Sequence, residues 1–146
     1  FKAYGISTHR HTIEIEEQFQ GLIPDKVIIQ FTPHLLPVDR GILVTSYAQI
    51  TSSEGMNQEK LDSLYYNFYM GKPFVRIRKN LPSIKEVRGS NFCDICPFWD
   101  ERTKRVISVA VIDNLVKGAA GQAIQNMNLM LGLDQTTGLL QAPIQP

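Results

Sequence analysis

The stretch from Gly41 to Ile50 constrains the fold more than any other part of this sequence, because ten consecutive residues carry no charge. Side chains of a β-strand point alternately to its two faces, and here both alternating sets are largely apolar. We expect such a strand to be buried on both faces. Helices of the same chain would cover one face, and a second copy, related by two-fold symmetry, would cover the other. The two sets are Ile42, Val44, Ser46 and Ala48, and Leu43, Thr45, Tyr47 and Gln49.

Four other segments have the composition of β-strands. Runs of β-branched and aromatic residues predict strands from Val27 to near Pro33 and at residues 73–78, 86–97 and 105–112. The polar residues 100–103 suit a hairpin between the last two strands. In the strand at 73–78, alternation places the arginines on one face.

Three segments have the apolar spacing of helices. Asn57 is a suitable N-cap for one of them and Asp113 for another, and Gly132 would end the helix that begins at Asp113. Together with the strands, these helices predict one α+β domain with a mostly antiparallel sheet and helices on one face. The expected helices and their inward residues are 12–19 with Ile15 and Phe19; 57–70 with Leu61, Leu64, Tyr65 and Phe68; and 113–131 with Val116, Ala120, Ala123, Ile124, Met127 and Leu131.

Length and charge limit the class of protein. The chain has 146 residues, which suits one domain, and its fifteen basic and fourteen acidic residues give a net charge of +1. This balance provides no broad positive field for nucleic acid or anionic lipid, and no apolar run approaches the roughly 20 residues that span a bilayer. Two cysteines are compatible with a reducing compartment, either the cytoplasm or an organelle matrix. Since the chain opens on Phe1 without an initiator Met, we expect a fragment of a longer protein.

His9 and His11 form the first candidate for catalysis, because residues two apart in an extended segment point the same way. An imidazole can serve as a general acid or base near neutral pH, and a carboxylate such as Glu14 can fix its tautomer. The alternative is an ordinary surface cluster of polar side chains. Spacing alone does not separate these two interpretations.

Cys93 and Cys96 have the C-x-x-C spacing of metal and redox sites. With His9 and His11 they could compose a zinc site. The flanking Phe92, Ile95, Phe98 and Trp99 instead favour a buried strand with incidental thiols, so no metal is expected.

Four arginines could recognise a carboxylate or a phosphate through a bidentate guanidinium, although most arginines in proteins are simply solvated. Two of them precede a glycine that would let the backbone approach a ligand. The chain has neither a G-x-G-x-x-G nor a P-loop sequence, so another domain would have to hold most of any nucleotide. The arginines are Arg40 and Arg88, followed by Gly41 and Gly89, and Arg76 and Arg78.

Four segments, in order along the whole chain, resemble the C-terminal part of N-acetyl-gamma-glutamyl-phosphate reductase. This arginine-pathway enzyme is related in plan to the aspartate-semialdehyde and glyceraldehyde-phosphate dehydrogenases. The last segment is long enough to be specific. The segments are His9-Arg10-His11-Thr12 with Glu14-Ile15-Glu16; Phe31-Thr32-Pro33-His34-Leu35 with Arg40-Gly41-Ile42; Val87 through Asp94; and Val111 through Ala123 continuing to Asn128.

The resemblance implies a two-domain enzyme that reduces an acyl phosphate to a semialdehyde with NADPH. In the family, a cysteine thiolate displaces phosphate and the resulting thioester accepts hydride, which is chemistry suited to covalent catalysis. That cysteine lies upstream of the His-Arg-His segment, outside this chain, so the chain alone is expected to be inactive. The implied partners are the dinucleotide-binding domain of the same protein and further copies of it, as a dimer or a dimer of dimers.

The resemblance also implies roles for individual residues. His9 would be the general acid and base, oriented by Glu14, although Ile13 stands where the family often has proline. Asn114 would hold the nicotinamide carboxamide. The substrate contacts would be His11, Arg40, Arg88, Ser90 and Asn91, and Gly118 and Gly121 would pack close to the dinucleotide domain.

Two other classes of function compete with this one. The first is a non-catalytic module that keeps the fold as a dimer-forming scaffold. The second is a metal or redox protein built on the C-x-x-C spacing. The presence of His9, His11 and Asn114 favours the reductase.

Overall fold

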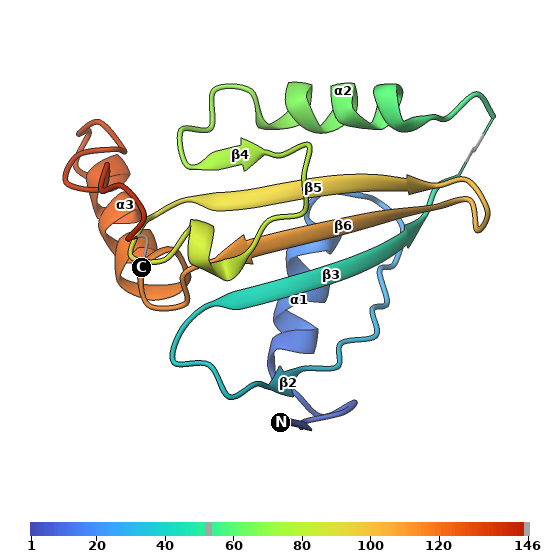
Figure 1. The fold of residues 1–146 in the computed structure, drawn as a ribbon, viewed down its shortest axis with the longest axis horizontal. Coiled ribbons are helices and arrows are strands. Elements are labelled where there is room, and N and C mark those ends of the chain that lie inside the picture. Colours follow the sequence, from blue (N-terminus) through green and yellow to red (C-terminus); the bar gives the residue numbers. More distant parts are fainter. Residues whose placement is uncertain (52–53, 145–146) are drawn as a thin grey trace. The chain divides into compact units, whose positions relative to one another are not determined.

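The computed structural model describes residues 1–51 and 54–144, and the chain divides into two compact units at Asp39–Arg40. Each unit is described by itself. The strands of the second unit form a four-stranded sheet, and helical segments lie around this sheet (Figure 1).

The sheet of the second unit has the strand order β3-β6-β5-β4. The pairs β3–β6 and β5–β6 are antiparallel, whereas β4 runs parallel to β5. The α+β class with a mostly antiparallel sheet is therefore confirmed. The strands are β3 (Ile42–Gln49), β4 (Val75–Ile77), β5 (Cys93–Asp100) and β6 (Arg105–Ile112).

Strand β5 begins later than the sequence predicts, so the expected strand at residues 86–97 is wrong in its first half. A short 3-10 turn, η1 (Ile84–Glu86), comes first, and the Ser83 backbone N–H donates to the Glu86 carboxylate at 2.7 Å. Gly89 then has a φ of +74°, which breaks the extended conformation. This irregular segment contains three of the residues predicted to bind substrate, namely Arg88, Ser90 and Asn91.

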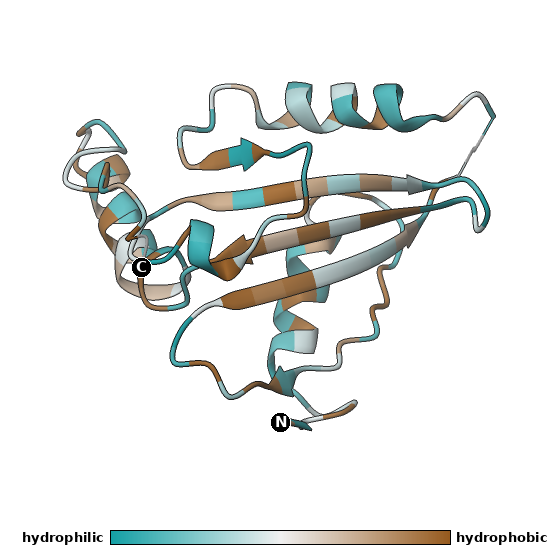
Figure 2. Ribbon diagram, viewed as in Figure 1, coloured by the Kyte–Doolittle hydropathy of each residue, from teal (hydrophilic) through white to brown (hydrophobic). Residues whose placement is uncertain are grey.

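All eight residues of β3 are exposed, in contrast to the expectation of burial on both faces. Strand β3 lies at the edge of the sheet, beside β6 alone. The first residues of β3 and much of β6 are brown in Figure 2, so this edge is apolar as well as uncharged. A long exposed apolar edge is uncommon in proteins that work as single chains.

Helix α2 (Gln58–Tyr69) begins where predicted, since the Asn57 side chain accepts a hydrogen bond from the Lys60 N–H. The helix contacts β5 and β4 (Figure 1). Leu61 is buried, but Leu64 and Phe68 are exposed, so half of the predicted stripe is wrong. Strands β4 and β5 offer α2 only a narrow surface. A single row of helix side chains, at positions i, i+4 and i+8, is enough to cover that surface.

The C-terminal helical segment has the predicted extent but begins with a wider turn. Asp113 accepts hydrogen bonds from the first backbone N–H groups, then a π-helical turn, η2 (Val116–Ala120), leads into α3 (Gly121–Met130). Gly132 follows with a φ of +70° and ends the helix as expected. Single π-helical turns are rare and often lie at functional sites.

The inward face of α3 is not the apolar one, so the predicted stripe of this helix is wrong. Gln125 and Asn128 are buried, whereas Ile124, Met127 and Leu131 are exposed. The buried amides are satisfied: Gln125 accepts from Lys117 Nζ at 2.8 Å, and the side-chain amide of Asn128 donates to the carbonyl of Thr137 at 2.9 Å. The apolar face of α3 is therefore left uncovered by the described residues.

The second unit has a small set of buried apolar side chains. They come from α2, β5 and β6, from the positions just before β4 and just after η1, and from the segment after α3. These side chains are Leu61, Phe74, Val87, Ile95, Cys96, Val106, Val111 and Leu139.

The first unit contains α1 (His11–Gln20) and a pair of two-residue antiparallel strands, β1 (Lys2–Ala3) and β2 (His34–Leu35). The expected helix at 12–19 is confirmed, but Phe19 is 47% exposed and no residue of α1 is buried. The expected strand from Val27 is wrong, because this segment runs extended without joining a sheet and Ile29 N–H donates to the Glu16 side chain at 3.0 Å. Across the described segments, none of the helices has both the length and the apolar character that a membrane crossing requires.

Candidate functional site

His9 lies where the chain enters α1, and both its backbone and its ring hold the first turn. Its carbonyl accepts the Thr12 N–H at 3.0 Å, and its ring Nδ1 accepts the His11 N–H at 3.2 Å. The ring is bordered by Tyr4 and Phe31, with centroid distances of 5.4 and 5.3 Å and edge-on geometry. The structure therefore places His9 in a partly exposed aromatic setting with a defined orientation.

Gly5 is needed for this setting, because its φ of +58° is a backbone conformation that other residues rarely adopt. A Cβ at this position would lie 3.1 Å from His9 Cδ2. The backbone of residue 5 thus closes one side of the imidazole.

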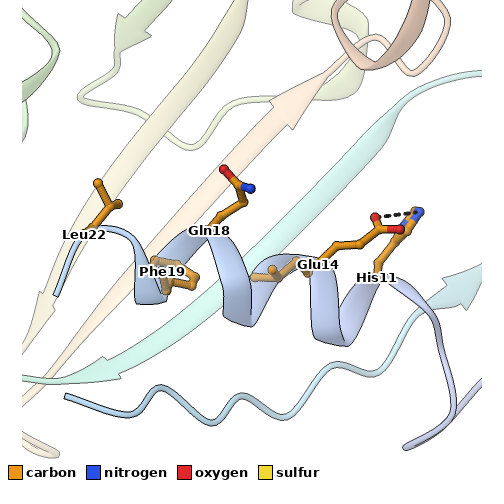
Figure 3. A pocket seen from close by; sticks show the side chains of 6 residues that line it. His11, Glu14, Gln18, Phe19 and Leu22 are labelled. Atoms are coloured by element: carbon orange, nitrogen blue, oxygen red, sulfur yellow. Dashed lines mark ion pairs between the residues drawn. The ribbon is translucent and has the colours of Figure 1, made fainter. Parts of the chain in front are cut away.

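His11 and Glu14 form an ion pair one helical turn apart, with 3.9 Å between Nε2 and Oε2. Both side chains are exposed, so this pair contributes little to stability. The pair stands at one end of a shallow hollow of about 470 Å³ along α1 (Figure 3). The hollow is mainly apolar and is lined by His11, Glu14, Ile15, Gln18, Phe19 and Leu22.

In the second unit, the carboxylate of Asp113 is fully buried and gathers four donors. Arg40 Nε lies 2.7 Å from Oδ2, and the Gly89 N–H lies 2.6 Å from the same oxygen. Oδ1 accepts the N–H groups of Leu115 at 2.8 Å and Val116 at 3.1 Å. Burial by itself raises the pKa of Asp113, but these hydrogen bonds outweigh it and hold the pKa below its ordinary value.

Asn114 follows directly, and its side-chain oxygen accepts the Gly41 N–H at 2.7 Å. Gly41 has a φ of +114°, and a Cβ there would lie 2.9 Å from Ile84 Cβ. Because Gly41 occupies the amide oxygen, the NH2 group is the part of Asn114 that can face a ligand. An acceptor such as a carbonyl oxygen fits that group.

Ser90 and Asn91 are also fully buried. Ser90 Oγ donates to the Val87 carbonyl at 2.7 Å, and Asn91 Nδ2 donates to Gln125 Oε1 at 3.2 Å. The other amide atom, Asn91 Oδ1, is buried and accepts no hydrogen bond from any described residue. It faces Gly121, where a Cβ would lie 2.3 Å away.

The remaining predicted site residues, Arg88 and Gly118, are next to residues that contact or follow Asp113. The Arg88 carbonyl accepts the Ile144 N–H at 2.8 Å, directly before the Gly89 that binds Asp113. Gly118 is exposed in the π-helical turn, and a Cβ there would lie 3.4 Å from Ile112 Cδ1. The structure thus gathers Arg40, Asp113 and Asn114 with the segment 88–91 in one unit, and His9, His11 and Glu14 in the other.

Neither cysteine has the properties of a nucleophile. Burial raises the pKa of Cys93, with a smaller opposing effect from Lys117, and burial followed by Asp62 raises the pKa of Cys96. Both are therefore thiols rather than thiolates near neutral pH. Within residues 1–51 and 54–144, no three His, Cys, Asp or Glu side chains gather as metal ligands would.

Sequence reasoning missed the central place of Asp113 and the rings of Tyr4 and Phe31. Asp113 has a recognisable signal, since it follows an apolar strand and precedes Asn114, but the local sequence around it predicts only a helix cap. Tyr4 and Phe31 lie 27 residues apart, and no local pattern connects either of them with His9.

The fold agrees with what comparison with known proteins shows. The chain belongs to the family of the semialdehyde dehydrogenase dimerisation domain, whose family model matches residues 1–114. Among curated proteins, it is similar to enzymes named N-acetyl-gamma-glutamyl-phosphate reductase, which confirms the resemblance seen in the sequence.

Three of these relatives show how much is shared. The reductase of Symbiobacterium thermophilum is 55% identical over 100% of this chain and 42% of its own length. That of Pelobacter propionicus is 55% identical over 95% of this chain and 40% of its own length. That of Brevibacillus brevis is 51% identical over 99% of this chain and 42% of its own length. The chain therefore spans about two fifths of the relatives it matches.

Proposed function

We propose that this chain is the C-terminal catalytic and dimerisation part of an NADPH-dependent reductase that converts N-acetyl-gamma-glutamyl phosphate to N-acetylglutamate semialdehyde. One observation supports this most strongly: 55% identity over the whole chain to a relative with that reductase name. The proposed location is the cytoplasm or another reducing compartment. The thiol nucleophile and most of the NADP-binding surface would come from the part of the relatives that this chain does not span.

The residues around Asn114 fit the nicotinamide end of that cofactor, which supplies hydride when bound. The Asn114 NH2 group is held as a donor, because Gly41 fixes the amide oxygen. Asp113 and Arg40 keep residues 40–41 and 113–114 together. Arg40 then serves the site through its ion pair with Asp113, in addition to the substrate contact that the resemblance implies.

The histidine cluster would supply the polar groups at the reacting carbonyl. His9 is partly exposed and oriented by its neighbours, so it can reach the oxygen on which charge develops. His11 would contact the substrate, and Glu14 would steady the His11 ring. In this proposal, residues 88–91 support the substrate-facing surface from within.

Two apolar surfaces support the proposed partners. The exposed, uncharged β3 fits a two-fold contact between copies, and stable interfaces of this kind bury on the order of 1,600 Å² in total. The exposed apolar face of α3 fits the dinucleotide-binding domain, next to Gly118. The same β3 surface supports the second candidate, a non-catalytic dimer-forming module.

Activity measurements separate the two candidates. Fused to the N-terminal part of a relative, the chain should reduce N-acetyl-gamma-glutamyl phosphate with NADPH, whereas the chain alone should not. A fusion that folds and dimerises without activity would favour the scaffold. Hydride transfer by the chain alone would contradict the placement of the nucleophile outside it.

Sedimentation equilibrium at micromolar concentration tests the dimer surface. The chain should sediment as a dimer, and Leu43→Glu, which adds a charge on exposed β3, should sediment as a monomer. Leu64→Glu on α2 is the matched control, since Leu64 is exposed to a similar degree. A folded monomer for the unchanged chain would contradict the proposed sheet contact.

A further inference from the structure

We propose that Lys117 is an acylation site, at which the Nζ amine takes the acyl group of an acyl phosphate. Lys117 lies in the π-helical turn η2, and the proposed reaction does not use it. Its reactivity follows from contacts within the second unit. Only the identity of the natural acylating agent, which would be the acyl phosphate substrate of the reductase, rests on the proposed function.

Lys117 differs from the other lysines of the chain in its exposure. All eight lysines lie in the part of the chain that the structure describes, and seven of them are exposed. Lys117 is partly buried, and its Nζ lies 5.5 Å from the centroid of the ring of Phe74, a fully buried side chain. Such surroundings remove water from an ammonium group and favour the neutral amine.

The hydrogen-bond partner of Lys117 is a neutral amide. Nζ donates to Gln125 Oε1 at 2.8 Å, and none of the ion pairs between described residues includes Lys117. An amide oxygen can accept a hydrogen from either an ammonium or an amine, whereas a carboxylate strongly favours the ammonium. Lys117 can therefore lose a proton and keep this hydrogen bond.

The titratable neighbour of Lys117 leaves the effect of burial in place. Burial lowers the pKa of Lys117 from its ordinary value, and Cys93 in β5 has a smaller opposite effect. Burial also raises the pKa of Cys93, so this neighbour is a thiol near neutral pH and does not hold the ammonium. More of the neutral amine, which is the nucleophilic form, is therefore present at Lys117 than at an exposed lysine.

The proposed step is a displacement at the acyl carbon. The Nζ lone pair forms a bond to the carbonyl carbon, the bond from that carbon to the phosphate oxygen breaks, and phosphate leaves with the electron pair. The nitrogen loses its proton to solvent, and the product is a neutral amide. No oxidant or reductant takes part. The reaction removes the positive charge of Lys117 from above the Phe74 ring.

Lys104 has the opposite arrangement and is the control within the same chain. It is exposed, and its Nζ forms an ion pair with Glu101. Neither the burial nor the neutral partner of Lys117 is present there. Lys104 should therefore be acylated more slowly than Lys117.

Acetyl phosphate is the probe for the chain alone. At about pH 8, where exposed lysines in proteins are mainly protonated, mass spectrometry should show Lys117 acetylated at least about three times faster than Lys104 and than the average of the other exposed lysines. In guanidinium chloride, which unfolds the chain, the rates should become similar. A rate at Lys117 no higher than at the exposed lysines of the folded chain, or a preference that survives unfolding, would overturn the proposal.

A substitution tests the neutral partner. Gln125→Glu places a carboxylate beside Nζ and favours the ammonium, so the rate at Lys117 should fall at least about threefold. Circular dichroism shows whether the variant is folded. An unchanged rate in the folded variant would contradict the proposed origin of the reactivity. If the variant does not fold, the comparison of the folded and unfolded unchanged chain decides.

Labelling by the proposed substrate connects the site with the reductase. In the fusion, N-acetyl-gamma-glutamyl phosphate without NADPH should add to Lys117 an acyl group that resists hydroxylamine, which cleaves thioesters, and Lys117→Arg should abolish this label. A fusion that reduces the substrate but does not label Lys117 would overturn the proposal for that substrate. A fusion that labels Lys117 but does not reduce the substrate would count against the proposed function alone.

Discussion

The histidine cluster and the Asp113 cluster both stand at the start of a helical segment, yet they are held in opposite ways. His9 is partly exposed, and one hydrogen bond and contacts with three rings, those of Tyr4, His11 and Phe31, orient it. Asp113 is fully buried and accepts four hydrogen bonds, one of them from Arg40. The difference fits the proposed roles, in which His9 must stay accessible to a reacting atom, whereas Asp113 positions other groups and can be enclosed.

The largest expected effect is on catalysis through His9. In an active fusion, His9→Ala should lower turnover by about 10²–10⁴-fold, the range for losing a group that acts on the reacting atoms. The free energy of unfolding should fall by only about 1–2 kcal/mol, because one exposed hydrogen bond and the ring contacts of a partly exposed side chain are lost. Steady-state kinetics and urea unfolding measure the two quantities. His34→Ala is the control. If His9→Ala and His34→Ala lowered turnover equally, His9 would have no special role in catalysis, and the contrast between His9 and Asp113 would be lost.

The opposite pattern is expected for Asp113. Asp113→Ala should lower the free energy of unfolding by about 3–5 kcal/mol, since Arg40 and three backbone N–H groups lose their buried acceptor. Asp134→Ala is the matched control, because Asp134 accepts from Thr136 on an exposed loop. Urea unfolding of the chain alone is sufficient. Similar small losses for both variants would show that burial of the carboxylate contributes little.

Gly121 tests how tightly the second unit is packed around Asn91. Gly121→Ala would bring a Cβ to 2.3 Å from Asn91 Oδ1, so the backbone must shift, and the expected cost is about 1–3 kcal/mol. Gly118→Ala lies three residues earlier, and its Cβ would have ordinary contacts from 3.4 Å. It should therefore cost less than Gly121→Ala. Thermal unfolding of the two variants gives the comparison.

A smaller effect is expected from pH, because the folded-state pKa of Asp113 is lowered. A lowered pKa stabilises the folded chain above the unfolded pKa of about 4, and this contribution is lost as the pH falls through that region. Unfolding free energies measured between about pH 6 and pH 3 should fall more steeply for the unchanged chain than for Asp113→Asn. Exposed carboxylates are present in both proteins, so the difference isolates Asp113. Parallel curves would contradict the lowered pKa.

The smallest expected effect concerns the cysteines. Elemental analysis should find no stoichiometric zinc in the purified chain, and Cys93→Ser should not change the metal content. Cys93 and Cys96 lie in β5, one partly and one fully buried, which fits incidental thiols in a strand. About one zinc per chain, lost on Cys93→Ser, would restore the C-x-x-C spacing as a metal site.

Local sequence patterns predicted the elements whose signals are local. Asn57 and Asp113 cap the helical segments as expected, and β3 and β6 lie where alternating apolar residues place them. The strand predicted at 86–97 is wrong in its first half, because those residues belong to a turn. The turn is made by Gly89 and by the hydrogen bond between Ser83 and Glu86. Val27–Ile29 has the composition of a strand but joins no sheet. A strand needs a neighbouring sheet edge to pair with, and whether such an edge is within reach depends on the whole fold.

The sequence by itself determined the family, most of the elements and the residue types available for catalysis, because these depend on neighbours along the chain. Only the tertiary structure decided which face of α3 is buried, where the Gln125 and Asn128 amides find partners that apolar side chains could not replace. It also decided that Asp113 joins Arg40 across 73 residues, and that Phe31 meets the His9 ring. Hydrogen bonds and ring contacts of this kind depend on distance in space, and periodicity along the chain does not encode that distance.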